Sequence, residues 1–585
     1  MKFTSRLNPT SWALSLLICI QLAFILWASS RGFDFTDEAF SFLGYKYPNE
    51  INKVATYYTS IFNSFLGWAN VSIIKIRILR LFLMVVCSIT LSLGLGRWID
   101  RNSEFNKSDQ INLVLFILLG SLLVHANGSQ SLTYNNASNF ILQLIVGFFL
   151  MTYEREFKLN RKDQLIYFCL GALLFALFAI KFSVGIIILF LLILFLIIDK
   201  RIKRNTLIYF SFLILGILSM GIFVFGFDLL NWFRDYFDTL KLLSSLTTTS
   251  IGSRYIEDVY YTLNSKILDN LFVVISIIIL LLLNHFIVRN WIRGVIAFAI
   301  ASLLIYLSYS HEYYLGGVKY YYIFTGLYII LIFALIIAEL IKAPINYVNG
   351  ARRNHFVNIL AIVLLLLPVA GAIGTNNLLS IQIIWYSAFL FAGMFLILYK
   401  NGTYIFNSAI IILGLNATLQ SLSGLVYHPY RLNQTLYEES CQLPAEITSE
   451  KVLVNKEIIQ SLEVAHQLIA SKTNFKKGDP IFSFSPDYLG FIYLLEGALP
   501  GWSWYDEKGT AYNCYNLKNT NFNNLDNMIV LSPSYYQMDS IYTNCFDEMN
   551  INFPNGYTKV GEVSYFMGSL DRSFTIFAPT RFLKE

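Results

Sequence analysis

The first three quarters of the chain consist of apolar stretches separated by short polar segments. An α-helix of about 20 residues crosses a hydrocarbon core of about 30 Å, and most of these stretches approach that length. The pattern therefore predicts about thirteen membrane-spanning helices. They are expected at residues 12–28, 78–96, 110–125, 138–152, 164–180, 183–198, 206–227, 268–287, 294–309, 320–341, 356–373, 381–399 and 404–424.

The pattern changes near residue 425, where the apolar stretches shorten to the length of strands. Residues 455–471 show the period of an amphipathic helix, and short apolar segments at 480–484, 528–532 and 574–577 are typical of strands. The sequence thus predicts an α-helical polytopic membrane protein with a C-terminal α/β domain outside the membrane. The expected domains are a transmembrane domain at residues 1–425 and an extracytoplasmic domain at residues 426–585.

Lysine and arginine gather in alternate loops, which sets the expected orientation. Because positively charged loops stay in the cytoplasm, the N-terminus is expected inside and the C-terminal domain outside a cell (inner) membrane that the chain crosses many times. The residues that carry this inference are Lys2, Arg6, Arg97, Arg101, Arg155, Lys158, Arg161, Lys162, Lys200, Arg201, Lys203, Arg204, Arg289, Arg293, Lys342, Arg352, Arg353 and Lys400. The first apolar run is interpreted as a retained anchor rather than a cleaved signal.

Composition agrees with a membrane protein. The chain is 56% hydrophobic and 14% charged, with a mean hydropathy of +0.56. Its net charge of +6 does not indicate a nucleic-acid partner, because the basic residues sit in loops between spans. No CxxC pattern is present, so no cofactor is indicated, and a divalent metal is left open. One disulfide is expected among Cys441, Cys514 and Cys545, whose pairing the sequence leaves open.

Three carboxylates follow the first apolar run, in the stretch Arg31-Gly-Phe-Asp-Phe-Thr-Asp-Glu-Ala-Phe40. Acidic groups at a membrane face need water or a cation, so we expect them to line a cavity. Asp37 is the candidate general base for a hydroxyl group. Glu38 would orient the acceptor or tune Asp37, and Asp34 is the reserve candidate. The alternative is a solvated acidic pair without function.

Cations near the expected outer face are candidates to hold an anionic lipid head group. A departing phosphate needs positive charge where its own charge develops, and arginine can bind it with two donors. The candidates are Arg77, Arg254, His311 and Lys319. The alternative is that Arg77 and Lys319, which border spans, only extend to the membrane interface.

Aromatic and amide side chains complete the candidate substrate contacts. Trp502 and Trp504 offer flat faces on which sugars stack, although interfacial anchoring or core packing explains them equally well. Asn135 is a candidate hydrogen-bonding residue, for which a plain turn is the alternative. Residues 54–68 form an amphipathic stretch that suits a helix lying in the membrane interface.

An Asp-Glu pair (Asp37 and Glu38) in the first outer loop, about thirteen spans and a C-terminal outer domain together resemble the GT-C glycosyltransferases. The layout is most similar to the protein O-mannosyltransferases and the lipid A aminoarabinose transferases. The resemblance implies a polyprenyl-phosphate sugar donor, transfer outside the cytoplasm with inversion, and Asp37 as the base. It also implies that residues 54–68 are juxtamembrane helices and that Arg77 is the arginine entering the second span. The family's His-Pro-Pro or Lys-Pro segment is absent, so the residue that holds the donor phosphate is open.

The expected function is therefore an inverting glycosyltransferase that glycosylates a cell-envelope acceptor. Surface polysaccharide such as O-antigen, lipid A and protein are the acceptors considered, and the expected partners are the lipid donor, the acceptor and the membrane. A polysaccharide polymerase or ligase and a multi-pass transporter or flippase are the alternatives. Few ionisable residues fall in the middle of spans, which disfavours an ion-coupled transporter.

Overall fold

The structure is a computed structural model of the 585-residue chain. It describes residues 8–48, 56–67, 71–102, 105–152, 161–198, 204–226, 231, 233, 234, 236–238, 352–373, 377, 379–399, 403–432, 434–501, 510–522, 525–534, 540–567 and 570–584. Three expected spans, at 268–287, 294–309 and 320–341, lie outside the described residues.

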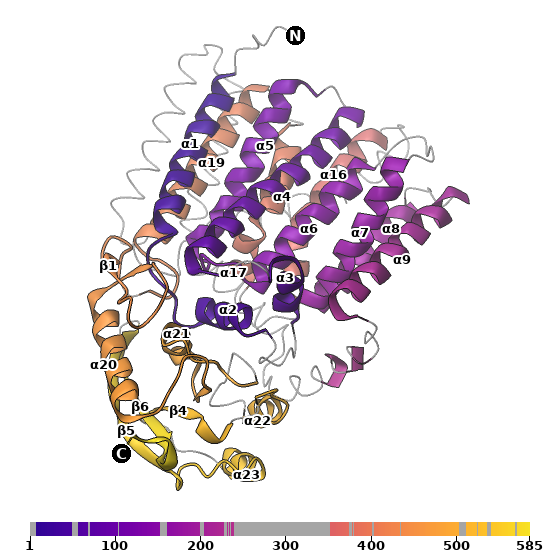
Figure 1. The fold of residues 1–585 in the computed structure, drawn as a ribbon. Coiled ribbons are helices and arrows are strands. Elements are labelled where there is room, and N and C mark those ends of the chain that lie inside the picture. The colour runs from indigo at the N-terminus through magenta and orange to yellow at the C-terminus, as the bar shows by residue number, and fades with distance from the viewer. Residues whose placement is uncertain are drawn as a thin grey trace.

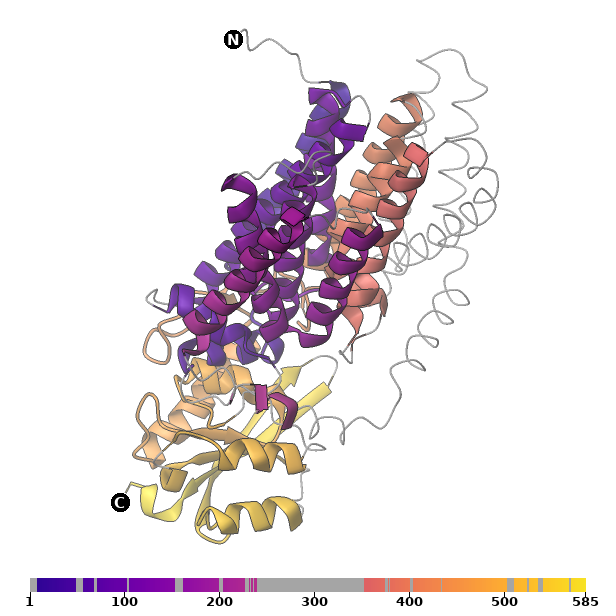
Figure 2. The ribbon, with the colours of Figure 1, turned by 90° about the vertical axis from the view of Figure 1, so that its right-hand side faces the viewer.

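Long helices lie side by side and form a bundle (Figures 1 and 2). They are α1 (Pro9–Ala28), α4 (Ile73–Asn102), α5 (Lys107–Leu122), α6 (Tyr134–Met151), α7 (Arg161–Ile180), α8 (Phe182–Ile198), α9 (Arg204–Phe225), α16 (Arg352–Ala372), α18 (Ser387–Tyr399) and α19 (Thr403–Val426). The short helix α17 (Leu379–Trp385) directly precedes α18. Two short helices, α2 (Asp37–Lys46) and α3 (Tyr58–Leu66), lie at one end of the bundle, which we call the α2 end.

Within the described part of the chain, five helices are long and apolar enough to cross a membrane. The number becomes six if α17 and α18 are counted as one broken span, because they meet at an angle of 75°. The expected span at 381–399 is therefore not one straight helix. The chain is mostly helical with several apolar spans, and the total of thirteen stays a prediction.

Glycines allow two of the bundle helices, α4 and α6, to approach closely. A Cβ atom on Gly94 of α4 would lie 2.2 Å from the carbonyl oxygen of Gly147 in α6. In a membrane, where lipid offers no hydrophobic gain for association, such small residues permit backbone contact. The contact fixes α4 against α6, and both helices carry candidate site residues at the α2 end.

Residues after α19 build a mixed sheet with flanking helices. Its strand order is β3-β4-β6-β5, with β3 and β4 parallel and the other pairs antiparallel. The strands are β1 (Cys441–Gln442), β2 (Leu453–Val454), β3 (Ile481–Ser483), β4 (Ile529–Pro533), β5 (Tyr557–Met567) and β6 (Leu570–Pro579). The helices are α20 (Lys456–Lys472), α21 (Leu489–Leu494), α22 (Thr510–Lys518) and α23 (Ser540–Glu548), with short 3-10 helices η2 (Pro486–Tyr488), η3 (Leu525–Asn527) and η4 (Thr580–Phe582). A further 3-10 helix, η1 (Leu123–Ala126), follows α5 in the bundle. The helix and the three strands expected from the pattern coincide with α20, β3, β4 and β6, whereas the domain boundary stays a prediction.

One disulfide joins two helices of this C-terminal part. It links Cys514 of α22 to Cys545 of α23, whereas Cys441 is free. The pairing that the sequence left open is thereby assigned.

The C-terminal part packs against the α2 end of the bundle (Figure 1). Arg31 and Leu453 form a parallel β-bridge, and Gly490 N donates to Phe35 O at 2.9 Å. The ring of Phe35 packs edge-on against Phe491 at 5.0 Å. The loop before α2, which carries the candidate carboxylates, is therefore held between the bundle and the C-terminal part.

Candidate active site

Asp34 organises the start of α2. Its Oδ1 accepts hydrogen bonds from Thr36 N at 2.9 Å and Thr36 Oγ1 at 2.7 Å, and its Oδ2 accepts one from Glu38 N at 3.2 Å. Acceptors placed here satisfy the free N–H groups of a first helical turn. Burial raises the pKa of Asp34 to about 7, the nearby charge of Asp37 adds to the rise, and the Thr36 hydrogen bonds oppose it. Asp34 therefore positions α2 and does not face the solvent.

Glu38 is buried in an ion pair with Arg77 of α4. Arg77 Nε lies 2.8 Å from Glu38 Oε1 and Nη2 lies 2.7 Å from Oε2, and both side chains are 2% exposed. Ser131 Oγ donates a further hydrogen bond to Glu38 Oε1. The remaining donors of Arg77 reach the carbonyl oxygens of Ser29, Arg31 and Gly32 at 2.7–3.1 Å. All five N–H groups of Arg77 are thus in use, and the pair holds the loop onto α4.

Asp37 is the accessible member of the three carboxylates, with 30% of its side chain exposed. It is the first residue of α2. Its Oδ2 accepts a hydrogen bond from the Tyr430 hydroxyl at 2.6 Å, and its Oδ1 accepts one from Arg431 Nη1 at 3.1 Å. Each carboxylate oxygen has two lone pairs, so acceptor capacity remains for a substrate hydroxyl. Asp37 alone among the three combines exposure with a charged environment suited to a base.

Tyr430 and Arg431 belong to the segment that follows α19, and the sequence analysis did not identify them. Arg431 Nη1 also donates to Thr36 Oγ1, and the guanidinium lies over the Tyr430 ring at 5.3 Å. Burial and the charge of Asp37 raise the pKa of Tyr430 well above its usual value, so its hydroxyl is a donor. More than 390 residues separate this pair from Asp37, and no local pattern marks it.

Asn135, at the N-terminal end of α6, contacts a buried lysine at the break between α7 and α8. Lys181 Nζ donates to Asn135 Oδ1 at 3.1 Å and to Gly371 O at 2.5 Å. It also lies 5.9 Å from the ring centre of Tyr134 and 5.7 Å from that of Tyr386. The sequence placed Lys181 near a span end and gave it no role.

The structure brings together only some of the expected site residues. Asp34, Asp37, Glu38, Arg77 and Asn135 lie at the α2 end. Arg254, His311, Lys319, Trp502 and Trp504 lie outside the described residues, so their roles stay predictions. Within the described ranges, no group of three His, Cys, Asp or Glu residues is placed to hold a metal ion.

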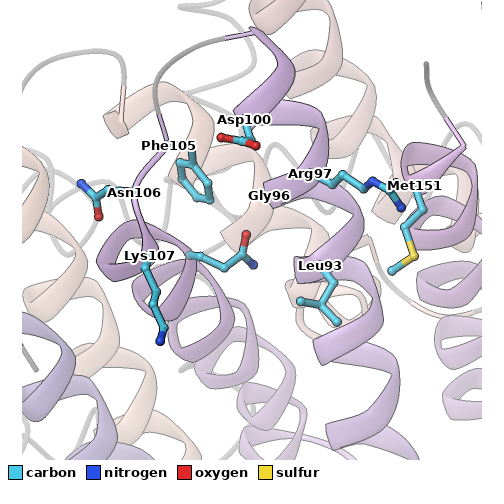
Figure 3. Close-up of a pocket in the computed structure, with 9 residues that line it drawn as sticks. Leu93, Gly96, Arg97, Asp100, Phe105, Asn106, Lys107 and Met151 are labelled. Carbon is cyan, nitrogen blue, oxygen red and sulfur yellow. The ribbon is translucent and has the colours of Figure 1, made fainter. Parts of the chain in front are cut away.

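A cavity of about 500 Å³ lies at the opposite end of α4, away from the candidate carboxylates. Figure 3 shows Arg97 and Asp100 on α4, with Lys107 at the start of α5. Arg97, Asp100 and Lys107 are exposed, and Met151 at the end of α6 completes one side. This cavity is separate from the candidate active site, because Arg77 and Arg97 occupy opposite ends of the same 30-residue helix.

No family model matches the chain, and no curated protein matches it. The solved structures that resemble it include two of ArnT from Cupriavidus metallidurans. The apo structure shows 10% identity and a TM-score of 0.43, with 98% of this chain and 99% of that chain covered. The structure bound to undecaprenyl phosphate shows 9% identity and a TM-score of 0.40, with 99% and 100% covered.

Proposed function

We propose that the chain is a glycosyltransferase that moves a sugar from a polyprenyl-phosphate donor to a hydroxyl group of a cell-envelope acceptor. The observation that carries the proposal is Asp37, a half-exposed carboxylate at the end of a membrane bundle and beside an arginine. A lipid-linked donor would enter from the bilayer, which places its sugar beside this end of the bundle.

In the proposed reaction Asp37 acts as the general base. The acceptor oxygen attacks the anomeric carbon while its proton passes to a carboxylate oxygen of Asp37. The bond between the anomeric carbon and the phosphate oxygen breaks, and its electron pair leaves with the lipid phosphate. Attack from the side opposite to the phosphate gives inversion. The phosphate needs no proton to depart when a cation compensates its charge.

Tyr430 and Arg431 hold Asp37 in the orientation that this reaction needs. Their hydrogen bonds occupy one lone pair on each carboxylate oxygen and fix the plane of the group. Glu38 is not available to bind an acceptor in this arrangement, since hydrogen bonds from Arg77, Ser131 Oγ and Asp34 N occupy both lone pairs on each of its oxygens. The expectation that Glu38 orients the acceptor is thus replaced here by a positioning role.

The test is sugar transfer by the purified chain from a polyprenyl-phosphate sugar pool, followed by mass spectrometry of the acceptor. Asp37→Asn should lower the turnover about 10²- to 10⁴-fold, as expected for loss of a general base. Asp100→Asn removes an exposed carboxylate at the opposite end of α4 and should leave turnover unchanged. Full activity of the Asp37→Asn protein would reject the proposed base.

A further inference from the structure

Lys181 is a buried lysine whose described partners are all uncharged. Its side chain belongs to a residue that is 6% exposed, and it donates to an amide oxygen and a backbone carbonyl. Among the described residues it forms no ion pair with a carboxylate. Burying an ammonium group without an opposite charge is costly, so an anion bound beside Lys181 would stabilise its charged form.

Backbone contacts place this lysine at the α2 end of the bundle. Tyr57 N donates to Ala179 O at 3.0 Å, and Thr56 Oγ1 donates to Ile180 O at 2.9 Å. Both carbonyl groups belong to the last turn of α7, directly before Lys181. The ammonium group and Asp37 therefore lie at the same end of the structure.

Tyr134 connects Lys181 with the neighbourhood of Asp37. Its ring is near the Lys181 ammonium group and 6.2 Å from the ring of Tyr58, which stacks on Phe40 of α2 at 6.4 Å. Tyr134 also lies within electrostatic range of Asp37. Residue 134 is only partly buried.

In an inverting displacement, the general base and the cation that binds the departing phosphate lie on opposite faces of the sugar. The acceptor and Asp37 approach one face of the sugar, and the phosphate departs from the other. Arg431 hydrogen-bonds directly to Asp37 and so stands on the side of the base. Lys181 interacts with Tyr134 rather than with Asp37, which suits the side of the leaving group.

We infer that Lys181 binds the phosphate of the polyprenyl-phosphate donor and receives the charge of the departing lipid phosphate. The inference rests on the proposed function and assigns the cation that the sequence left open. An ammonium group has three N–H donors, and Asn135 and Gly371 use two, so the third donates to the phosphate. The ring of Tyr134 would then lie along the sugar between phosphate and base.

The test measures binding of undecaprenyl phosphate and of undecaprenol, the same chain without the phosphate. The dissociation constant for undecaprenol divided by that for undecaprenyl phosphate isolates the contribution of the phosphate. This quotient is the ratio used below. Lys181→Gln keeps N–H donors for Asn135 and Gly371 but removes the charge, and should lower the ratio about 10-fold or more. Lys181→Arg should restore most of it. The matched control Lys46→Gln, on α2 at the same end, should not change it.

Each outcome separates the inference from the proposed function. An unchanged ratio in folded Lys181→Gln protein overturns the role of Lys181 and leaves the proposed function in place. No preference for phosphate in the wild-type chain overturns the proposed donor and this inference together. Should Lys181→Gln fail to fold, Asn135→Asp provides the second variant, because a carboxylate beside Lys181 competes with phosphate and should lower the ratio similarly.

Discussion

Glu38 and Arg77 form a buried two-point ion pair that ties the first turn of α2 to the first turns of α4. The same guanidinium group donates to three carbonyl oxygens of the preceding loop. A planar group with five donors in fixed directions can satisfy all of these acceptors, which a lysine cannot do. The pair therefore determines the shape of the loop from which Asp37 emerges.

Breaking this pair should destabilise the folded chain. Arg77→Met leaves the Glu38 carboxylate buried without its partner, and we expect a loss of about 3–5 kcal/mol in the free energy of unfolding. Thermal unfolding in detergent measures this loss of stability. Arg431→Met removes a partner of Asp37 whose side chain is 38% exposed. This substitution should lower the free energy of unfolding by at most about 1 kcal/mol. Equal losses in the two variants would contradict the structural role of Arg77.

Tyr430→Phe should reduce turnover without unfolding the chain. The substitution removes one hydrogen bond to the Asp37 carboxylate and keeps the ring beneath Arg431. A hydrogen bond to a charged group contributes about 1.5–3 kcal/mol, so we expect a loss of about 10-fold or more in kcat. Tyr427→Phe, at a side chain that is 48% exposed in the same segment, is the control and should retain full turnover.

Asp34 should give the folded chain a distinct pH dependence. Burial raises its pKa from 3.8 to about 7, so between these values the unfolded chain releases a proton that the folded chain retains. This contribution to stability is complete below pH 4 and is lost as the pH rises to 7. In the Asp34→Asn protein, residue 34 does not titrate in this pH range. The melting temperature of the variant minus that of the wild type should therefore rise from pH 4.5 to pH 7, and a constant difference would contradict the assignment.

Peptide mapping under non-reducing conditions should recover one linked pair in the C-terminal part. Cys514 and Cys545 should appear in a joined peptide, whereas Cys441 should react with an alkylating reagent. The two linked residues are 31 positions apart, so their disulfide should contribute about 3.7 kcal/mol by restricting the unfolded chain. Replacing both with serine should lower the melting temperature of this part, and Cys441→Ser should not.

The sequence located the loop of the candidate site because carboxylates directly after an apolar span stand out from their surroundings. It did not distinguish the three acidic residues. Their roles depend on burial, and burial depends on contacts with residues far along the chain. Glu38 becomes a structural group only because Arg77 lies opposite it, and Asp37 stays accessible only because its partners cover one side.

Distance along the chain also explains what sequence reasoning missed. Tyr430 and Arg431 follow the last span in a segment that shows no motif, and their importance comes from contacts with a residue more than 390 positions away in the sequence. Lys181 resembled an ordinary residue at the end of a span. Apolar period and length predicted many helices well, yet they did not predict the 75° bend between α17 and α18.

The contacts of Asp37 with Tyr430 and Arg431 have a consequence for biosynthesis. A ribosome adds about 5–20 residues per second, so these partners emerge about 20 to 80 seconds after Asp37 itself. Leu453, which bridges to Arg31, appears later still. A nascent chain interrupted before residue 430 would carry Asp37 without either of these two hydrogen-bonding partners. The candidate site can therefore assemble only when synthesis of the chain is nearly complete.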